Sequence, residues 1–299
     1  MRYHGPSYHS PRHHRPGTRR HTPRIAAYAV YAVYIVMAAV WALSGAARAQ
    51  APVAGDPWPG LVSDVFKGRA VEDGTGLIAL DMPARAEDAA IVPVTVRSTL
   101  RPDDGRQVRT VTIIIDQNPA PVVATFELGA KAGVASISTR VRVDSYTNVH
   151  AVAELTDSKL YAVKTFVKAA GGCSAPAAKN ADEANANVGQ LKFRVFAKSD
   201  DPADTNLREA QIMIRHPNNS GMQMDQITRL YVPAFFVREV KIWQGDDLVL
   251  AMDGGISVSE NPNIRFTYVP NGAKTFRVEA TDTDGHVYKG EWPSAASEM

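Results

Sequence analysis

Hydrophobic and polar residues alternate with a period of two through most of the chain from residue 77 onward. Turn residues interrupt this alternation at short intervals, and β-branched residues dominate the apolar positions, as in the run VRTVTIII. Such a pattern is typical of short β-strands that bury one face. In the first half the predicted strands are 91–96, 108–115, 122–128, 135–143, 149–155 and 160–167.

The alternation stops at Ala169 and resumes near residue 191. Between these points, residues 171–187 read GGCSAPAAKNADEANAN and contain no aromatic and no β-branched residue. Because such a segment has little to bury, it is predicted to be a flexible linker. In the second half the predicted strands are 191–196, 210–214, 231–243, 248–252, 264–268, 275–281 and 287–292.

Many short strands with regular turn signals predict an all-β protein built from β-sandwiches. The composition break divides it into two domains, residues 50–170 and 188–299, joined by the flexible linker 171–187. No convincing long amphipathic helix follows residue 50, which excludes a parallel α/β fold with its crossover helices.

The first fifty residues differ from the rest of the chain. Residues 1–24 are rich in Arg, His and Pro and contain no acid, and residues 25–47 contain no charge at all. Ala47-Arg48-Ala49 matches the small-x-small pattern of a signal peptidase site. We therefore expect a signal peptide, residues 1–49, and a periplasmic protein that begins at Gln50. The alternative is a retained membrane anchor, because the apolar run is long enough to span a bilayer.

The formal net charge is only +2, and much of the positive charge lies near the N-terminus. This argues against a nucleic-acid partner, which requires a basic surface on a folded domain. The chain has one cysteine, Cys173, so it cannot form an internal disulfide. A lone cysteine is usually a small buried hydrophobe. Here Gly171, Gly172 and the following Ser-Ala-Pro supply no bulk to enclose it, which favours an accessible thiol that serves as an attachment site.

A cysteine–histidine enzyme is the competing interpretation. Three histidines remain beyond the N-terminal segment, His150, His216 and His286, and each is interpreted as a surface or turn residue rather than as a base for the thiol. The Asp282-x-Asp284-Gly285 segment is better explained by a tight hairpin than by a calcium loop. No catalytic residue, metal site or cofactor is therefore predicted.

The ordered segments of the two halves resemble a known pair of proteins. The first half is similar to SoxY, through Leu80-Asp81-Met82-Pro83, Ile91-Val92-Pro93-Val94, Asn118-Pro119-Ala120-Pro121, Ser138-Thr139-Arg140-Val141-Arg142, Ala151-Val152-Ala153-Glu154 and Gly171-Gly172-Cys173. The second half is similar to SoxZ, through Leu207-Arg208, Ile214-Arg215-His216-Pro217, Gly221-Met222, Glu260-Asn261-Pro262 and Thr281-Asp282-Thr283-Asp284-Gly285.

The resemblance implies two immunoglobulin-like sandwiches that associate tightly and a cysteine, Cys173, that carries sulfur intermediates between partner enzymes. Here the arm continues into the second domain instead of ending after the cysteine, and the fusion resembles SoxYZ-like carriers associated with quinoprotein alcohol dehydrogenases. The implied partners are periplasmic redox or sulfur-transfer enzymes, including a PQQ-dependent dehydrogenase and its cytochrome, and the association leaves thiosulfate in doubt as the cargo. The alternative is a non-covalent docking protein for such a dehydrogenase, in which Cys173 is dispensable.

Overall fold

The computed structural model describes residues 55–101, 103–175, 187–196 and 206–295. The expected signal peptide and residues 176–186 of the expected linker lie outside the described residues. Within the described part of the chain, no helix is both long and apolar enough to cross a membrane. The elements are α2 (Trp58–Phe66), β1 (Val71–Asp73), β2 (Ile78–Asp81), β3 (Val92–Ser98), β4 (Val108–Ile115), β5 (Val122–Leu128), β6 (Ser136–Val141), β7 (Thr147–Leu155), β8 (Leu160–Val167), β9 (Leu191–Phe196), β10 (Arg208–Ile214), β11 (Val237–Gln244), β12 (Asp247–Gly254), β13 (Asn263–Tyr268), β14 (Thr275–Asp282) and β15 (Val287–Pro293).

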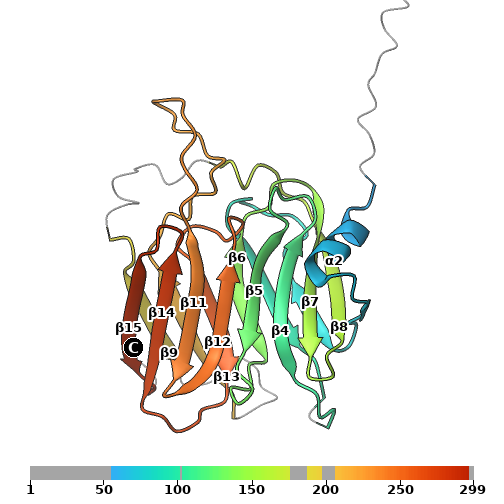
Figure 1. Ribbon diagram of the computed structural model, residues 1–299, viewed down its shortest axis with the longest axis vertical. Helices are drawn as coiled ribbons and strands as arrows, with labels where there is room; N and C mark the ends of the chain where they lie inside the picture. The colour runs from blue at the N-terminus through green and yellow to red at the C-terminus, as the bar shows by residue number, and fades with distance from the viewer. Residues whose placement is uncertain (1–54, 102, 176–186, 197–205, 296–299) are drawn as a thin grey trace, which may run out of the picture. The chain divides into compact units, whose positions relative to one another are not determined.

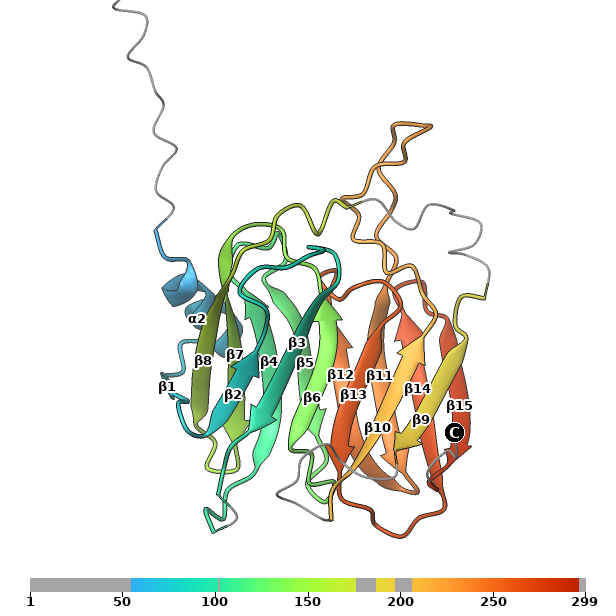
Figure 2. The same cartoon turned by 180° about the vertical axis from the view of Figure 1, so that it is seen from behind.

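The strands form two sheets, as expected for an all-β sandwich. One sheet has nine strands in the order β1-β8-β7-β4-β5-β12-β11-β14-β15, and Figure 1 shows most of them side by side. The other has six strands in the order β2-β3-β6-β13-β10-β9, which face the viewer in Figure 2. The side chains buried between the sheets form the main hydrophobic cluster.

Both sheets run without interruption from the first half of the chain into the second. β5 pairs with β12 from Leu128 opposite Leu250 to Ala124 opposite Gly254, and β6 pairs with β13, with Ile137 opposite Phe266. The sequence pattern predicts two sandwiches joined by a linker, whereas here the second half extends the sheets of the first. The pairing satisfies backbone groups that would otherwise form four open sheet edges.

The largest local difference from the predicted strands lies before β11. The alternation predicts a strand from Tyr231, but β11 begins at Val237. Residues 219–235 instead form a hairpin loop, with bridges between Asn219 and Phe235 and between Met224 and Tyr231. Pro233 has no N–H to donate to a ladder, which disfavours strand pairing at this point. By contrast, β4, β5, β8 and β9 have the predicted bounds.

The short helix α2 was not predicted, because its nine residues give only a brief periodic signal. It covers the outer face of the nine-stranded sheet, where Phe66 packs with Ile114, Val152 and Leu160. The neighbouring Ile113 and Ile115 point into the core between the sheets. The apolar run of β4 is therefore explained by burial on both faces of the strand.

We predict that residues 56–175 and 187–299, produced together as separate chains, form a stable one-to-one complex, and that each chain alone aggregates. Each half alone would expose one side of the β5–β12 and β6–β13 pairings and its share of the core. Size-exclusion chromatography with light scattering measures both outcomes. A soluble, monomeric half that unfolds cooperatively would show that the halves are independent domains.

Candidate functional site

Cys173 lies in a turn that follows β8 and is tied to the segment after β6. The Gly171 N–H donates to the Asp144 carbonyl oxygen at 2.7 Å, and the Gly172 N–H donates to the Val143 carbonyl oxygen at 3.0 Å. The Cys173 N–H donates to Asp144 Oδ1 at 3.2 Å. Three consecutive amides are thus held by two residues of the first half.

The two glycines are needed for different reasons. Gly171 has a φ of 76°, in the left-handed region that other residues adopt only with strain. Gly172 lies against other backbone, and a Cβ atom there would be 2.1 Å from the Ala89 carbonyl oxygen and 2.6 Å from that of Val143. The sequence analysis interpreted these glycines as flanks too small to enclose the thiol, but in the structure they allow the turn to pack closely.

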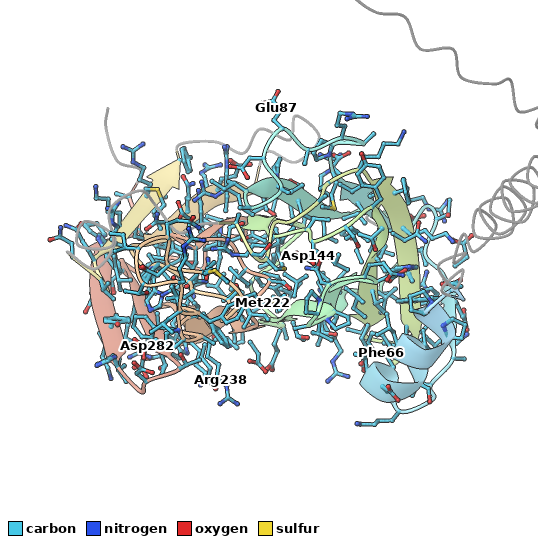
Figure 3. The ribbon with its side chains drawn as sticks, turned by 90° about the horizontal axis from the view of Figure 1, so that it is seen from above. Phe66, Glu87, Asp144, Met222, Arg238 and Asp282 are labelled. Carbon is cyan, nitrogen blue, oxygen red and sulfur yellow. The ribbon has the colours of Figure 1, made fainter. Side chains whose placement is uncertain are left out.

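The second half of the chain covers this turn from the other side. Ser220 Oγ donates to the Cys173 carbonyl oxygen at 2.5 Å, and Ser257 forms a hydrogen bond with the thiol. Figure 3 shows Asp144 and Met222, from the two halves, in the middle of this end of the sandwich. Met222 belongs to the same loop as Ser220, whose hydroxyl accepts from the Met222 N–H at 3.2 Å. The turn is therefore enclosed by residues of both halves.

The prediction of an exposed thiol was wrong, because Cys173 is 0% exposed. Its immediate neighbours are small, as the sequence indicated, but the atoms that enclose it come from distant segments around Asp144, Ser220 and Ser257. Small flanking residues let these segments approach closely. Residues 171–175 are thus part of the folded structure rather than of a free tether.

The surroundings of Cys173 keep its thiol protonated at neutral pH. Burial raises the pKa of Cys173 to about 11, and the negative charge of Asp144 acts in the same direction. The guanidinium of Arg142 and the hydrogen bond from Ser257 act in the opposite direction. Because the thiolate is the nucleophile, the enclosed thiol reacts slowly as long as the turn stays closed.

Arg142 is a site residue to which the sequence patterns assigned no role. Its Nη1 donates to the Gly172 carbonyl oxygen at 3.3 Å, and its Nη2 donates to the Asn218 carbonyl oxygen at 3.2 Å. A single guanidinium thus joins the cysteine turn to the loop of the second half. No signal in the sequence indicated this burial, because Arg142 occupies a polar position of the alternating pattern, between Val141 and Val143.

The three histidines lie in other parts of the structure, and two of them are more buried than predicted. His150 is 3% exposed; its ring stacks on Trp58, and its Nε2 lies 3.2 Å from Asp116 Oδ2. His216 is 0% exposed because the loop after β10 turns it inward, and burial lowers its pKa. His286 lies 3.0 Å from Asp282, in a hairpin. None of the hydrogen bonds among the described residues links a histidine to Cys173.

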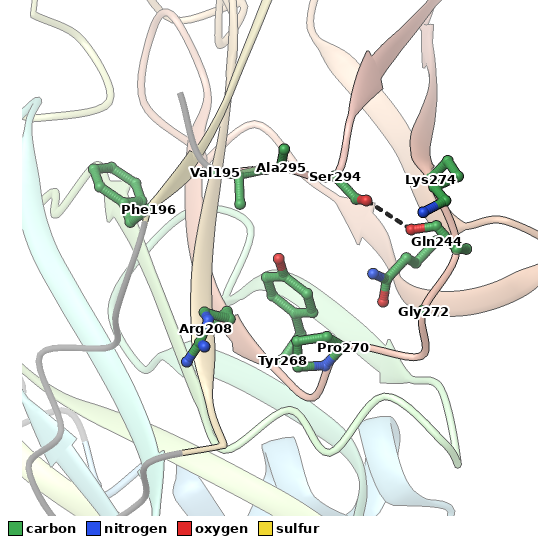
Figure 4. Close-up of a pocket in the computed structure, with 11 residues that line it drawn as sticks. Val195, Phe196, Arg208, Gln244, Tyr268, Pro270, Gly272, Lys274, Ser294 and Ala295 are labelled. Atoms are coloured by element: carbon green, nitrogen blue, oxygen red, sulfur yellow. Dashed lines mark hydrogen bonds between the residues drawn. The ribbon is translucent and has the colours of Figure 1, made fainter. Parts of the chain in front are cut away.

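A pocket lined by Phe196, Arg208, Tyr268, Lys274 and other residues lies elsewhere in the second half (Figure 4). Gln244, the last residue of β11, is on its wall, whereas the loop of Ser220 meets the first residues of β11, through the bond from the Val237 N–H to Asn218 Oδ1. The pocket and Cys173 therefore lie at opposite ends of this strand, and the pocket has no part in the cysteine site.

Among solved structures, the chain is similar to the sulfur carrier protein SoxY from Chlorobium limicola f thiosulfatophilum, at 25% identity over 38% of this chain and 91% of that chain, with a TM-score of 0.33. It is also similar to two variant forms of the superoxide reductase (neelaredoxin) from Ignicoccus hospitalis. Both are 10% identical with a TM-score of 0.27, over 37% and 32% of this chain and 90% and 82% of theirs.

No curated protein matches the chain. Two family models match it in succession. Sulfur oxidation protein SoxY matches residues 62–173, and sulphur oxidation protein SoxZ matches residues 197–293. The boundary of the first match is Cys173 itself, at the turn where the two halves meet. The chain is therefore a sulfur-oxidation carrier protein in which a SoxY domain is followed by a SoxZ domain in one polypeptide.

Proposed function

We propose that this protein holds a sulfur intermediate, or a related thiol-bound group, covalently on Cys173 and presents it to partner enzymes. The observation that carries the proposal is the position of Cys173. It is the only cysteine of the chain and the last residue of the SoxY match, and it lies in a turn that both halves enclose. Gly171 and Gly172 are the flanking residues that build this turn.

Attachment of an anionic sulfur group replaces the S–H bond of Cys173 with an S–S bond. For an anion such as thiosulfate, this step joins its outer sulfur to Sγ and releases one proton and two electrons. The loading partner must therefore accept two electrons, one at a time if it is a cytochrome. This chain supplies the thiol, and the oxidising chemistry belongs to the partner, which agrees with a carrier rather than an enzyme.

We further propose that the protein works in the periplasm, after removal of residues 1–49, and that a PQQ-dependent alcohol dehydrogenase and its cytochrome are among its partners. The charge-free run at 25–47 with Ala47-Arg48-Ala49 supports export. The dehydrogenase context is proposed from the resemblance of the fused chain to SoxYZ-like carriers associated with quinoprotein alcohol dehydrogenases.

The second candidate function is a docking protein that binds its partner without a covalent cargo. The burial of Cys173 favours this alternative, as does the loop 219–235, which carries an exposed apolar tip. In that tip Ile227 is 93% exposed, Leu230 69% and Tyr231 66%. Exposed apolar groups of this size are typical of surfaces that contact another protein. On either proposal the tip is a contact for partners; only the first requires the thiol.

We predict that protein purified from its native cells without reductant carries an added mass on Cys173 that a thiol reductant removes. Intact mass spectrometry measures the adduct and also shows whether the chain begins at Gln50. Cys173→Ser should carry no adduct and should fail to complement a deletion strain, because serine cannot form the S–S bond.

The matched control is Cys173→Ala, which removes the thiol without placing a hydroxyl in the enclosed site. Both variants should keep the circular dichroism spectrum of the parent protein. Full complementation by both variants would refute the carrier proposal and leave the docking function in its place.

A further inference from the structure

Arg142 is the largest fully buried side chain of the described residues, with 1% of it exposed. Its two Nη atoms donate to backbone carbonyl oxygens, of Gly172 and Asn218, and its Nε has no hydrogen-bond partner. None of the ion pairs among the described residues includes Arg142. A guanidinium stays protonated in proteins, so this end of the sandwich contains an enclosed positive charge that forms no ion pair with a carboxylate of the described residues.

A buried charge without an ion-pair partner destabilises the folded protein, so its presence points to a functional role. Buried charges are normally paired, and an apolar residue of similar size in the same place usually gives a more stable protein. Burial lowers the pKa of Arg142, and the negative charges of Glu260 and Asp88, neither of which forms an ion pair with it, act in the opposite direction. The fold therefore tolerates an unpaired cation at this position.

The cation is directed at the cysteine turn. Arg142 Nη1 contacts the carbonyl oxygen of the residue before Cys173, and its charge acts on the thiol itself. A second enclosed donor, Gln223 Nε2, also has no partner, and Gln223 Oε1 accepts from Ser220, which binds the Cys173 carbonyl oxygen. The planar guanidinium fits oxyanions well and binds them more strongly than a neutral donor does.

We propose that Arg142 is the counter-ion of the group that Cys173 carries. An adduct that ends in a negative charge, such as a sulfonate linked through a sulfur atom, binds the Arg142 guanidinium in the closed turn, whereas a neutral adduct of Cys173 does not. Arg142 thereby selects anionic cargo. This inference rests on the proposed carrier function, and its test uses chemically loaded protein.

The test compares two adducts on purified full-length protein. Tetrathionate reacts with the thiolate, releases thiosulfate and leaves Cys173–S–SO₃⁻. Methyl methanethiosulfonate releases methanesulfinate and leaves the neutral Cys173–S–CH₃. Both products contain one new S–S bond to Sγ and are verified by intact mass. The measured quantity is the midpoint temperature of thermal unfolding of each adduct.

We expect the sulfonate adduct to unfold at a temperature at least about 3 °C above that of the methyl adduct, as a charge-assisted hydrogen bond in a chain of this size would produce. In Arg142→Met this difference should disappear, and in Arg142→Lys, which keeps the charge but not the planar fork, part of it should remain. The matched control is Arg140→Met. Arg140 also donates across the two halves, to the Asn261 carbonyl oxygen at 2.9 Å, but none of the hydrogen bonds among the described residues joins its side chain to the cysteine turn.

A sulfonate adduct that is no more stable than the methyl adduct in the unchanged protein would overturn the inference, and so would a difference that survives in Arg142→Met. If neither Arg142 variant folds, the unfolding temperatures of the two adducts of the unchanged protein still show whether the closed turn stabilises an anionic adduct. Because both adducts are made chemically, this result is independent of the cellular test. A native adduct without a stability difference would refute only the role of Arg142. A stability difference without a native adduct would refute only the carrier function.

Discussion

Iodoacetamide should label Cys173 of the folded protein at least about 100-fold more slowly than it labels the unfolded chain at pH 8, and the folded rate should keep rising until about pH 11. The reason is that alkylation requires the thiolate. Burial, followed by Asp144, raises the pKa of Cys173 from its ordinary 9.0 to about 11. At pH values below about 9, this difference between the two pKa values leaves about 100-fold less thiolate in the folded protein than in the unfolded chain. Steric enclosure slows the reaction further.

The raised pKa of Cys173 also makes the stability of the folded protein depend on pH. Between about pH 9 and pH 11 the unfolded chain has lost the thiol proton while the folded protein retains it, so stability falls as the pH rises through this window. Asp144→Asn keeps the oxygen that accepts from the Cys173 N–H but removes the charge, and should move the labelling profile to lower pH. A folded rate near that of the unfolded chain, with a plateau near pH 9, would contradict the closed turn.

Gly172→Ala should open the turn and raise the labelling rate of Cys173 at pH 8 by at least about tenfold. An added methyl group would meet two backbone oxygens, those of Ala89 and Val143, and neither is the end of a flexible side chain. The turn must therefore move away, which breaks the bond from the Gly172 N–H to Val143 and exposes the thiol. The rate of iodoacetamide labelling, followed by intact mass, measures the effect.

Gly171→Ala is the matched control in the same turn. It introduces strain through the positive φ, on the order of 1–2 kcal/mol, but the closest atom to its Cβ is Ser174 Oγ at 3.9 Å. Its effect on labelling should be clearly smaller. If the two glycines served only as flexible joints, the two substitutions would have similar effects, and that result would restore the prediction of a flexible linker with an accessible thiol.

The alternation of residues along the chain was sufficient to locate individual strands. The bounds of β4 and β8 follow from their apolar runs and flanking turns, because both signals are local. The order of strands in the sheets was not predictable in this way. The pairing of Leu128 with Leu250 joins residues far apart in the sequence, and either strand would show the same pattern at an open edge.

The surroundings of Cys173 were not predictable from the sequence. The single cysteine beside Gly171 and Gly172 drew attention to this segment from the sequence alone, but as part of a flexible linker. Whether that turn is open or closed depends on Ser220 and Ser257, which approach it only in the folded chain. The role of small residues is ambiguous in a sequence, since they suit a flexible tether and a tightly enclosed turn equally well.

The continuous sheets have a consequence for the behaviour of the protein on dilution. Two separate subunits joined by the same strand pairs would obey mass action and dissociate as their concentration falls. In this chain the β5–β12 and β6–β13 pairings are intramolecular, so their occupancy does not depend on protein concentration. The two halves are also always made in equal numbers, and no excess of either one competes for partners. A site enclosed by both halves therefore stays complete even when the protein is scarce.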